Sequence, residues 1–225
     1  DDYASSEESQ PVKWSKLFRF KQTWAYITGK GLIDPIYWFF LFWLPSYFST
    51  TFELDLKKPS FELMIIYAAT TIGSIFGGYF SSYLVKKGWE TLKARKTALL
   101  IFAILELSII MAQFAKGPWV AVALLSIAVA AHQAWAANVF TMASDMFPSQ
   151  VVSSVVGIGG MAGALGGILF PMFIGAVLDK FKADGNIHAG YNLIFTICGC
   201  TYLIALLIIH LLTKNKVKVR LEEIQ

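Results

Sequence analysis

Six apolar segments of membrane-spanning length follow one another along this chain. They cover residues 24–52, 63–85, 97–115, 119–147, 155–178 and 191–213. A helix needs about 20 apolar residues to cross the hydrocarbon core of a bilayer. There, an α-helix satisfies its backbone polar groups by hydrogen bonds within the helix. The sequence therefore predicts an all-α membrane protein, a six-transmembrane-helix bundle over residues 24–213.

The amounts and positions of charge support this class and orient the bundle. Only 15% of the residues are charged, against about 25% in soluble domains, and the short linkers leave no room for a soluble domain. If residue 1 is cytoplasmic, thirteen Lys and Arg residues fall in inner loops and five in outer loops. The positive-inside rule then places both termini in the cytoplasm. The net charge of +4 therefore reflects this orientation and does not indicate binding to nucleic acid. The expected partner is the lipid bilayer.

The two ends of the chain are polar. Residues 1–23 are predicted to be a cytoplasmic linker between two bundles, followed by a basic flank, because they begin acidic and become basic before the first apolar segment. Residues 13–21 suit either a short amphipathic helix on the inner membrane surface or a simple orienting flank. Residues 214–225 are predicted to be a basic cytoplasmic tail.

Two opposite charges lie inside the first apolar segment. Lys30 and Asp34 are four residues apart, and Pro35 follows directly. A charge at the bilayer centre costs about 2.5–3.5 kcal/mol on insertion scales, and a proline breaks the helical hydrogen-bond ladder. A helix break beside an ionisable residue at membrane depth is typical of transporters. We therefore expect Pro35 and Asp34 to act in gating or coupling.

Polar residues form one stripe along this first segment. Helical spacing places Thr23, Tyr26, Lys30, Asp34 and Tyr37 on one side. In a functional interpretation, Lys30 binds an anionic group of a substrate, and Asp34 is its partner or a proton carrier. In a structural interpretation, the two residues form only an i,i+4 ion pair that hides two charges. Tyr37 would add a hydroxyl for the substrate.

The fourth segment carries a second polar cluster. An aromatic ring beside an amide suits a sugar, whose ring has an apolar face and a polar edge. On this side of the helix we expect Trp135, Asn138, Met142 and Asp145, with His132 at the border and Gln133 on the other side. His132 suits either a proton-linked role or hydrogen-bonded packing. Asp145 is expected to be structural, as a cap at the turn into the fifth segment.

Glycines dominate the fifth segment. Gly159, Gly163 and Gly167 repeat at a spacing of four, which makes a smooth face for close helix contact. This face suits packing, and it also suits a helix that slides against its neighbour, so Gly159 and Gly163 are candidates for gating. Pro171 is expected to kink the outer half of this helix.

Two further polar features have open interpretations. The hydroxyl stripe Tyr67, Thr71, Ser74 and Gly78 in the second segment suits either a polyol ligand or ordinary interhelical hydrogen bonds. Glu106 stands alone in the third segment, where a neutral carboxyl bonded to a neighbouring helix is expected. A proton-carrying role for Glu106 is the alternative.

Motifs of soluble enzymes do not occur in the sequence. There is no G-x-x-x-x-G-K-[ST], G-x-S-x-G, H-E-x-x-H or C-x-x-C. Cys198 and Cys200 point about 200° apart on a helix, which argues against a disulfide or a shared metal. We expect no enzyme activity, no catalytic residues, no metal and no cofactor, with the proton as the only coupling ion.

Four stretches carry a resemblance to a known family. They are FKQTWAY (20–26), DPIYWFFLFWLP (34–45), HQAWAANVFTMASDMFP (132–148) and SVVGIGGMAGALGGILFP (154–171). With six helices, a broken first helix and a Gly-rich fifth, the chain resembles the C-terminal half of a major facilitator superfamily transporter. Among these, it is similar to bacterial hexuronate transporters of the anion:cation symporter family.

This resemblance implies a function and a set of roles. It implies proton-coupled uptake of glucuronate or galacturonate through the bacterial inner membrane, together with an N-terminal six-helix half. The first, second, fourth and fifth helices would line the cavity, and the third and sixth would face outward. Lys30 would meet the sugar-acid carboxylate, and ring contacts would come from Tyr37, Gln133, Trp135 and Asn138. Another organic anion, such as galactonate, glucarate or an aromatic acid, and a non-transporting sensor or scaffold are the alternatives.

Overall fold

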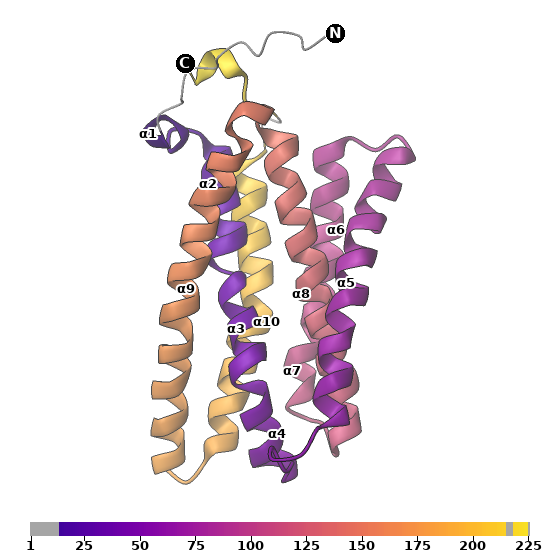
Figure 1. Ribbon diagram of the computed structural model, residues 1–225, viewed down its shortest axis with the longest axis vertical. Helices are drawn as coiled ribbons and strands as arrows, with labels where there is room; N and C mark the ends of the chain where they lie inside the picture. The colour runs from indigo at the N-terminus through magenta and orange to yellow at the C-terminus, as the bar shows by residue number, and fades with distance from the viewer. Residues whose placement is uncertain (1–13, 215–217, 225) are drawn as a thin grey trace, which may run out of the picture.

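The computed structural model describes residues 14–214 and 218–224, and most of them lie in helices. The first thirteen residues of the predicted linker and residues 215–217 and 225 of the predicted tail lie outside the described part. The helices are α1 (Trp14–Leu17), α2 (Lys21–Gly31), α3 (Asp34–Phe42), α4 (Leu44–Phe52), α5 (Phe61–Lys86), α6 (Thr91–Glu106), α7 (Ser108–Ala112), α8 (Pro118–Met146), α9 (Ser149–Ala183) and α10 (Ile187–Leu212), followed by the 3₁₀ turn η1 (Leu221–Glu223). The long helices lie along a common axis (Figure 1).

Four helices in the described part are long and apolar enough to cross a membrane, namely α5, α8, α9 and α10. The other two predicted segments consist of shorter helices placed end to end. Residues 24–52 contain most of α2 and all of α3 and α4, and residues 97–115 contain most of α6 and all of α7. The expected all-helical membrane class therefore agrees with the structure, while the count of six transmembrane helices stays a prediction.

Prolines explain the interruptions of the first segment. Pro35 and Pro45 lie in the first turns of α3 and α4, where a missing N–H group costs nothing within the new helix but prevents the preceding helix from continuing. The predicted break beside Asp34 is therefore present. In contrast, α9 continues through Pro171 as one helix.

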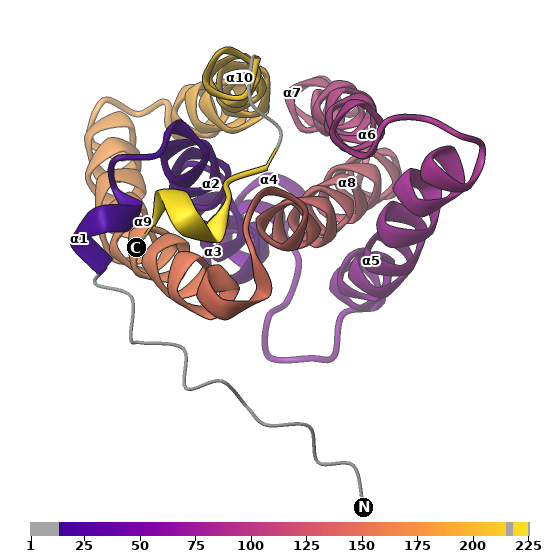
Figure 2. The ribbon, with the colours of Figure 1, turned by 90° about the horizontal axis from the view of Figure 1, so that it is seen from above.

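The helices form two groups that share a central contact. In the first group, α9 and α10 pack against α2, and α9 also packs against α3; in the second, α5 and α6 pack against α8. Viewed along the helices, α8 and the α2–α4 line occupy the middle, between α9 and α10 on one side and α5 and α6 on the other (Figure 2). Contacts of α8 with α2 and of α10 with α6 join the groups. Both α1 and η1 lie at the same end of the bundle (Figure 1).

Small residues bring α5 and α8 into close contact. A Cβ atom added at Gly77 would lie 2.6 Å from Ala134 Cβ, and one added at Gly73 would lie 2.6 Å from the carbonyl carbon of Ala130. Real side chains cannot approach so closely, so the two glycines set the distance between these helices. This pair was not predicted from the sequence, where the spacing of four was recognised only for the glycines of the fifth segment.

Candidate functional site

A buried ion pair bridges the break between α2 and α3. Lys30 is the second-last residue of α2, and Asp34 is the first residue of α3. Lys30 Nζ lies 2.6 Å from Asp34 Oδ2, and the two side chains are 8% and 25% exposed. The lysine is thus enclosed, while the carboxylate keeps some contact with the outside.

The glycine face of α9 lies directly against this pair. A Cβ atom at Gly159 would meet the Tyr26 ring and would lie 3.3 Å from Lys30 Cγ. One at Gly163 would lie 2.6 Å from Asp34 Oδ2. The next turn, at Gly167, faces the Trp38 indole in the same way. The predicted close contact of this glycine face is confirmed, and its partner is the polar stripe of α2 and α3.

On its other side the lysine meets an aromatic ring of α8. Lys30 Nζ lies 4.1 Å from the ring centroid of Phe140, a distance at which the ring face attracts a cation. Phe140 is 45% exposed. The sequence analysis missed this residue, although its spacing of seven from Gln133 puts both residues on one face of the helix.

Tyr37 and His132 continue the polar region away from the ion pair. Their rings are stacked with centroids 5.2 Å apart and an interplanar angle of 10°. His132 Nδ1 is also hydrogen-bonded to the hydroxyl of Tyr202 in α10, at 2.6 Å. His132 is buried and Tyr37 is half-buried, so only Tyr37 has surface left for a ligand. The packing interpretation of His132 agrees with these contacts, and its coupling role stays a prediction.

Trp135 and Asn138 lie inside the bundle. Both are fully buried. Trp135 Nε1 donates to the carbonyl of Gly29 at 3.4 Å, and Asn138 Nδ2 donates to the carbonyls of Gly77 and Ala134 at 2.9 and 2.8 Å. The bonds to Gly29 and Gly77 hold α8 against α2 and α5, and the bond to Ala134 lies within α8. Substrate contact stays a prediction for both residues, and the contacts themselves give them a packing role.

Of the ring contacts predicted on α8, Gln133 is the one that lies on the accessible face of the helix. Gln133 is half-buried, and it shares its face with Phe140 and the exposed Ser144. Its side chain keeps accessible surface, and it lies on the same helix face as Phe140, which contacts Lys30. The structure brings together Lys30, Asp34, Pro35, Gly159 and Gly163, with Tyr37 one turn further along α3.

The hydroxyl stripe of α5 is only partly engaged. Tyr67 donates to the carbonyl of Phe40 in α3 at 3.0 Å, which is an interhelical bond of the expected kind. Thr71 and Ser74 are exposed, and an atom added at Gly78 would meet nothing within 4 Å. This part of the stripe lies on the open surface of the described bundle.

A second ion pair lies at the end of the bundle near the α5–α6 loop. Arg95 Nε of α6 donates to Asp145 Oδ2 of α8 at 2.9 Å, and Arg95 also donates to the Ser81 hydroxyl of α5. Asp145 is therefore structural, as expected. The expected cap is wrong, however, because the N-cap of α9 is Pro148, with no side-chain cap bond, and Asp145 is engaged by Arg95.

Glu106 is the most deeply buried carboxyl group in the described chain. It ends α6, is 0% exposed, and neither carboxylate oxygen has a described hydrogen-bond partner. The expected bond to a neighbouring helix is therefore not found among the described residues. An ionised carboxylate without a partner is strongly disfavoured in such a place, which supports the predicted neutral form.

Comparison with known proteins decides the family. Residues 3–171 match the model of the Major Facilitator Superfamily. This chain belongs to the Major Facilitator Superfamily. Membership and the four membrane-length helices point to a multi-pass membrane protein.

Curated relatives of this superfamily member include transporters of sugar acids. The D-galactonate transporter of Escherichia coli O6:H1 is 26% identical over 184 residues, which cover 80% of this chain and 42% of the relative. The hexuronate transporter of Escherichia coli K12 is 26% identical over 202 residues, covering 89% and 45%. The probable galactarate/D-glucarate transporter of Escherichia coli K12 is 26% identical over 178 residues, covering 79% and 38%. The chain thus spans less than half the length of these relatives.

Proposed function

We propose that this chain is the C-terminal half of a proton-coupled symporter that takes up a sugar acid by alternating access. In this proposal the bundle has six transmembrane helices with both termini in the cytoplasm of a bacterium, and it works against an N-terminal six-helix half in the inner membrane. The preferred substrates are glucuronate or galacturonate. Superfamily membership and the sugar-acid relatives support the substrate class.

The observation that carries the proposal is the Lys30–Asp34 pair at the helix break. A pair needed only to cancel two charges is better replaced by apolar residues, because burying both ions costs more than their attraction returns. Here the pair lies where α2 stops and α3 starts, and the aspartate side chain is 25% exposed. It is therefore placed where an anion or a proton can reach one partner without unfolding a helix.

Competition for Lys30 links the proton to the substrate. When Asp34 is ionised it occupies the ammonium group, at 2.6 Å. When Asp34 takes up a proton it gives up this charge-assisted bond, and the carboxylate of the sugar acid replaces it. The site then holds one cation and one anion both before and after loading, so a proton and a monoanion enter together without an uncompensated buried charge.

The remaining contacts fit a polar ring held against aromatic surface. Phe140 lies beside Lys30 and would pack against the apolar face of the sugar. Tyr37 and Gln133 keep accessible surface, and each can bond hydroxyl groups. Trp135 and Asn138 would support the site indirectly, by fixing α8 against α2 and α5. In a conformation that exposes them, they would contact the substrate directly.

The test is uptake of labelled glucuronate into proteoliposomes that contain the full-length transporter, with and without an inward proton gradient. We expect accumulation above equilibrium with the gradient, competed by galacturonate and not by glucose. Galactonate, glucarate and an aromatic acid complete the competitor panel and identify the substrate if another anion is preferred. Accumulation that does not depend on the proton gradient would contradict proton symport. Binding without any accumulation would indicate a non-transporting sensor or scaffold.

A further inference from the structure

A groove with a basic end lies between α6 and α10, away from the Lys30 site. Its volume is about 590 Å³. At the end nearest the α5–α6 loop it is lined by Lys93, Lys96, His210 and Lys214, called here the basic end. Further along the helices it is lined by Leu100, Leu203, Leu206 and Leu207, called here the leucine part. Among the described residues, Glu90 is the one carboxylate that lines it.

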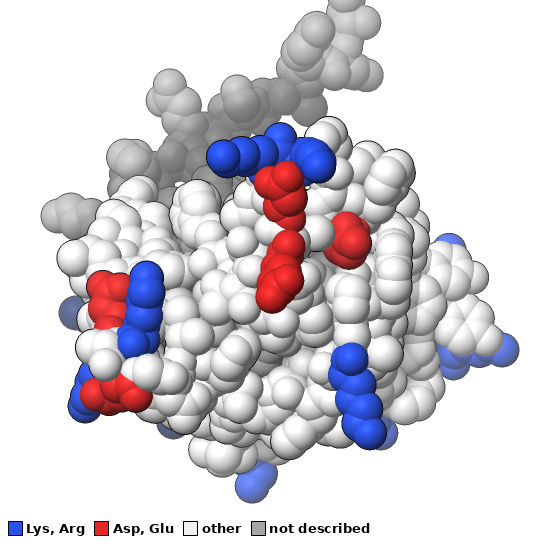
Figure 3. All heavy atoms as spheres, turned by 90° about the horizontal axis from the view of Figure 1, so that it is seen from below, with Lys and Arg blue, Asp and Glu red and all other residues white. Residues whose placement is uncertain are grey.

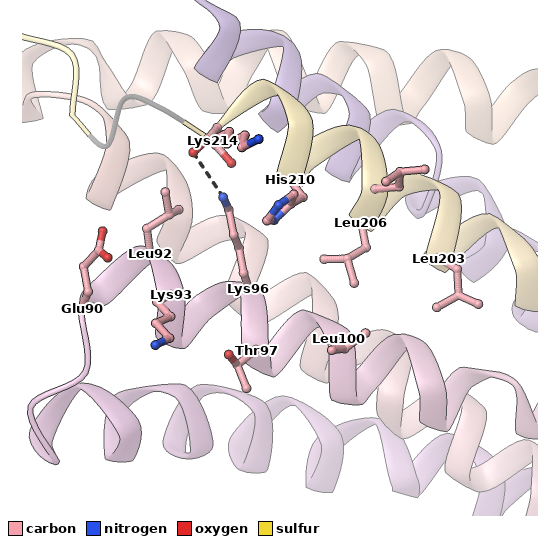
Figure 4. A pocket seen from close by; sticks show the side chains of 12 residues that line it. Glu90, Leu92, Lys93, Lys96, Thr97, Leu100, Leu203, Leu206, His210 and Lys214 are labelled. Carbon is pink, nitrogen blue, oxygen red and sulfur yellow. Dashed lines mark hydrogen bonds between the residues drawn. The ribbon is translucent and has the colours of Figure 1, made fainter.

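The geometry of the groove is that of an amphipathic site. Lys96 and His210 point from α6 and α10 toward the space between these helices (Figure 4). Lys96 Nζ donates to the carbonyl of Thr213, the C-cap residue of α10, at 3.2 Å. Leu100, Leu203 and Leu207 are 44%, 38% and 58% exposed. The leucine part is therefore open along the side of the bundle, where lipid chains lie in a membrane protein.

An aromatic residue marks the depth of the basic end. Trp89 is 40% exposed, and Lys93 Nζ lies 5.3 Å from its ring centroid. Tryptophan is enriched at the level of the lipid headgroups, where its ring is half in lipid and half in water. The basic end therefore lies at headgroup level, with the leucine part below it toward the hydrocarbon core.

We propose that this groove binds an anionic phospholipid. The phosphate lies at the basic end, and an acyl chain lies along the leucine part. Basic pockets between transmembrane helices attract anionic headgroups, and the excess of lysine over the single Glu90 supplies that attraction here. A free phosphate ion would leave the leucine part unfilled, so the shape of the whole groove selects a lipid.

The experiment compares two photoreactive lipids in the full-length transporter. Trace phosphatidylglycerol or phosphatidylcholine with a diazirine in its acyl chain is added to phosphatidylcholine vesicles, and labelling of residues 97–100 and 203–210 is mapped by mass spectrometry. We expect several times more labelling from phosphatidylglycerol. The ratio corrects for general exposure to lipid, and excess inorganic phosphate should leave it unchanged.

Matched variants locate the charge requirement. Lys93→Gln with Lys214→Gln should bring the ratio down to about one, since a lysine near the membrane surface contributes about 1 kcal/mol to anionic lipid binding, which is about five-fold in affinity. Lys96 is kept because it also joins α6 to α10. Lys93→Arg with Lys214→Arg keeps the charge and should keep the ratio.

A control with the same change in charge lies at the opposite end of the bundle. There, basic side chains lie beside acidic ones (Figure 3), and Lys58 pairs with Asp55 at 3.7 Å. Lys57→Gln with Lys58→Gln should leave the labelling ratio unchanged. Equal labelling by the two lipids in the unaltered protein, or an equal loss in both glutamine variants, would overturn the proposal. Loss of the ratio in excess phosphate would overturn the lipid assignment in favour of a free anion.

Discussion

Lys30 and Asp34 are four residues apart in the chain, yet they belong to two helices that meet at a break. A change of either residue therefore acts on the site and only weakly on helix formation. Lys30 contacts a carboxylate at 2.6 Å and an aromatic face at 4.1 Å. Asp34 contacts the lysine and keeps 25% of its side chain exposed. Substitution of Lys30 and substitution of Asp34 should accordingly affect different steps of transport.

We predict that Lys30→Gln weakens sugar-acid binding, whereas Asp34→Asn leaves binding intact and loses proton-driven accumulation. Loss of one charge-assisted bond weakens binding by about 10- to 100-fold. Removal of the aspartate charge leaves Lys30 permanently available but removes the proton site. Binding is measured by scintillation proximity and accumulation in proteoliposomes, with Lys58→Gln as a control for net charge. Full accumulation by Asp34→Asn would assign the proton to another group.

Glu106 offers the second prediction at this scale. Glu106→Gln should change the free energy of unfolding by less than about 1 kcal/mol, because a neutral carboxyl and an amide bury similar polar groups. Transport should be retained. The measurements are thermal unfolding of the purified protein and gradient-driven uptake. A variant with unchanged melting temperature that no longer accumulates substrate would instead make Glu106 a proton carrier.

Among the elements, α9 contacts the site through its glycine face. Gly163 faces Asp34, while its neighbour Gly160 meets nothing within 4 Å. We predict that Gly163→Ala destabilises the protein by about 1–3 kcal/mol, since the added methyl group must push α9 away from α3. Gly160→Ala is the matched control, and it should be neutral or stabilise by up to about 1 kcal/mol, because alanine favours helix over glycine. Thermal unfolding of both variants compares them, and equal stabilities would show that the two helices separate freely at this contact.

The contact of α5 with α8 gives an independent pair of neighbouring glycines. A Cβ atom at Gly77 would lie 2.6 Å from Ala134 Cβ, whereas one at Gly78 would meet nothing within 4 Å. Gly77→Ala should therefore lower the melting temperature and weaken the Asn138 bond to the Gly77 carbonyl. Gly78→Ala should leave the melting temperature unchanged. The opposite order of stability would mean that α5 does not pack on α8 through this face.

For the whole molecule, the bundle places its basic loops at one end. The α5–α6 loop lies at the same end as α1 and η1, and the α4–α5 loop lies at the other (Figure 1). With both termini inside, we predict that Lys58→Cys reacts with a membrane-impermeant maleimide in intact cells and that Lys86→Cys reacts only after permeabilisation. Cys198 and Cys200 are first changed to Ser in both variants. Reaction of Lys86→Cys in intact cells would reverse the predicted orientation.

The sequence by itself determined the features that depend on near neighbours in the chain. Apolar length predicted membrane helices, Pro35 predicted the break, and a spacing of four predicted both the Lys30–Asp34 contact and the smooth glycine face of α9. Each of these follows from local backbone geometry. They also support the central hypothesis, because the proposed anion site lies within one broken segment.

Only the tertiary structure decided which faces are covered and by what. Trp135 and Asn138 look like sugar contacts in sequence, yet α2 and α5 cover them, and the accessible face of α8 carries Phe140 instead. Asp145 is engaged by Arg95, fifty residues earlier in the chain. The groove between α6 and α10 likewise joins segments about a hundred residues apart. Burial depends on which helices lie side by side. Helical periodicity shows which residues share a face of one helix, but it does not show which other helix covers that face.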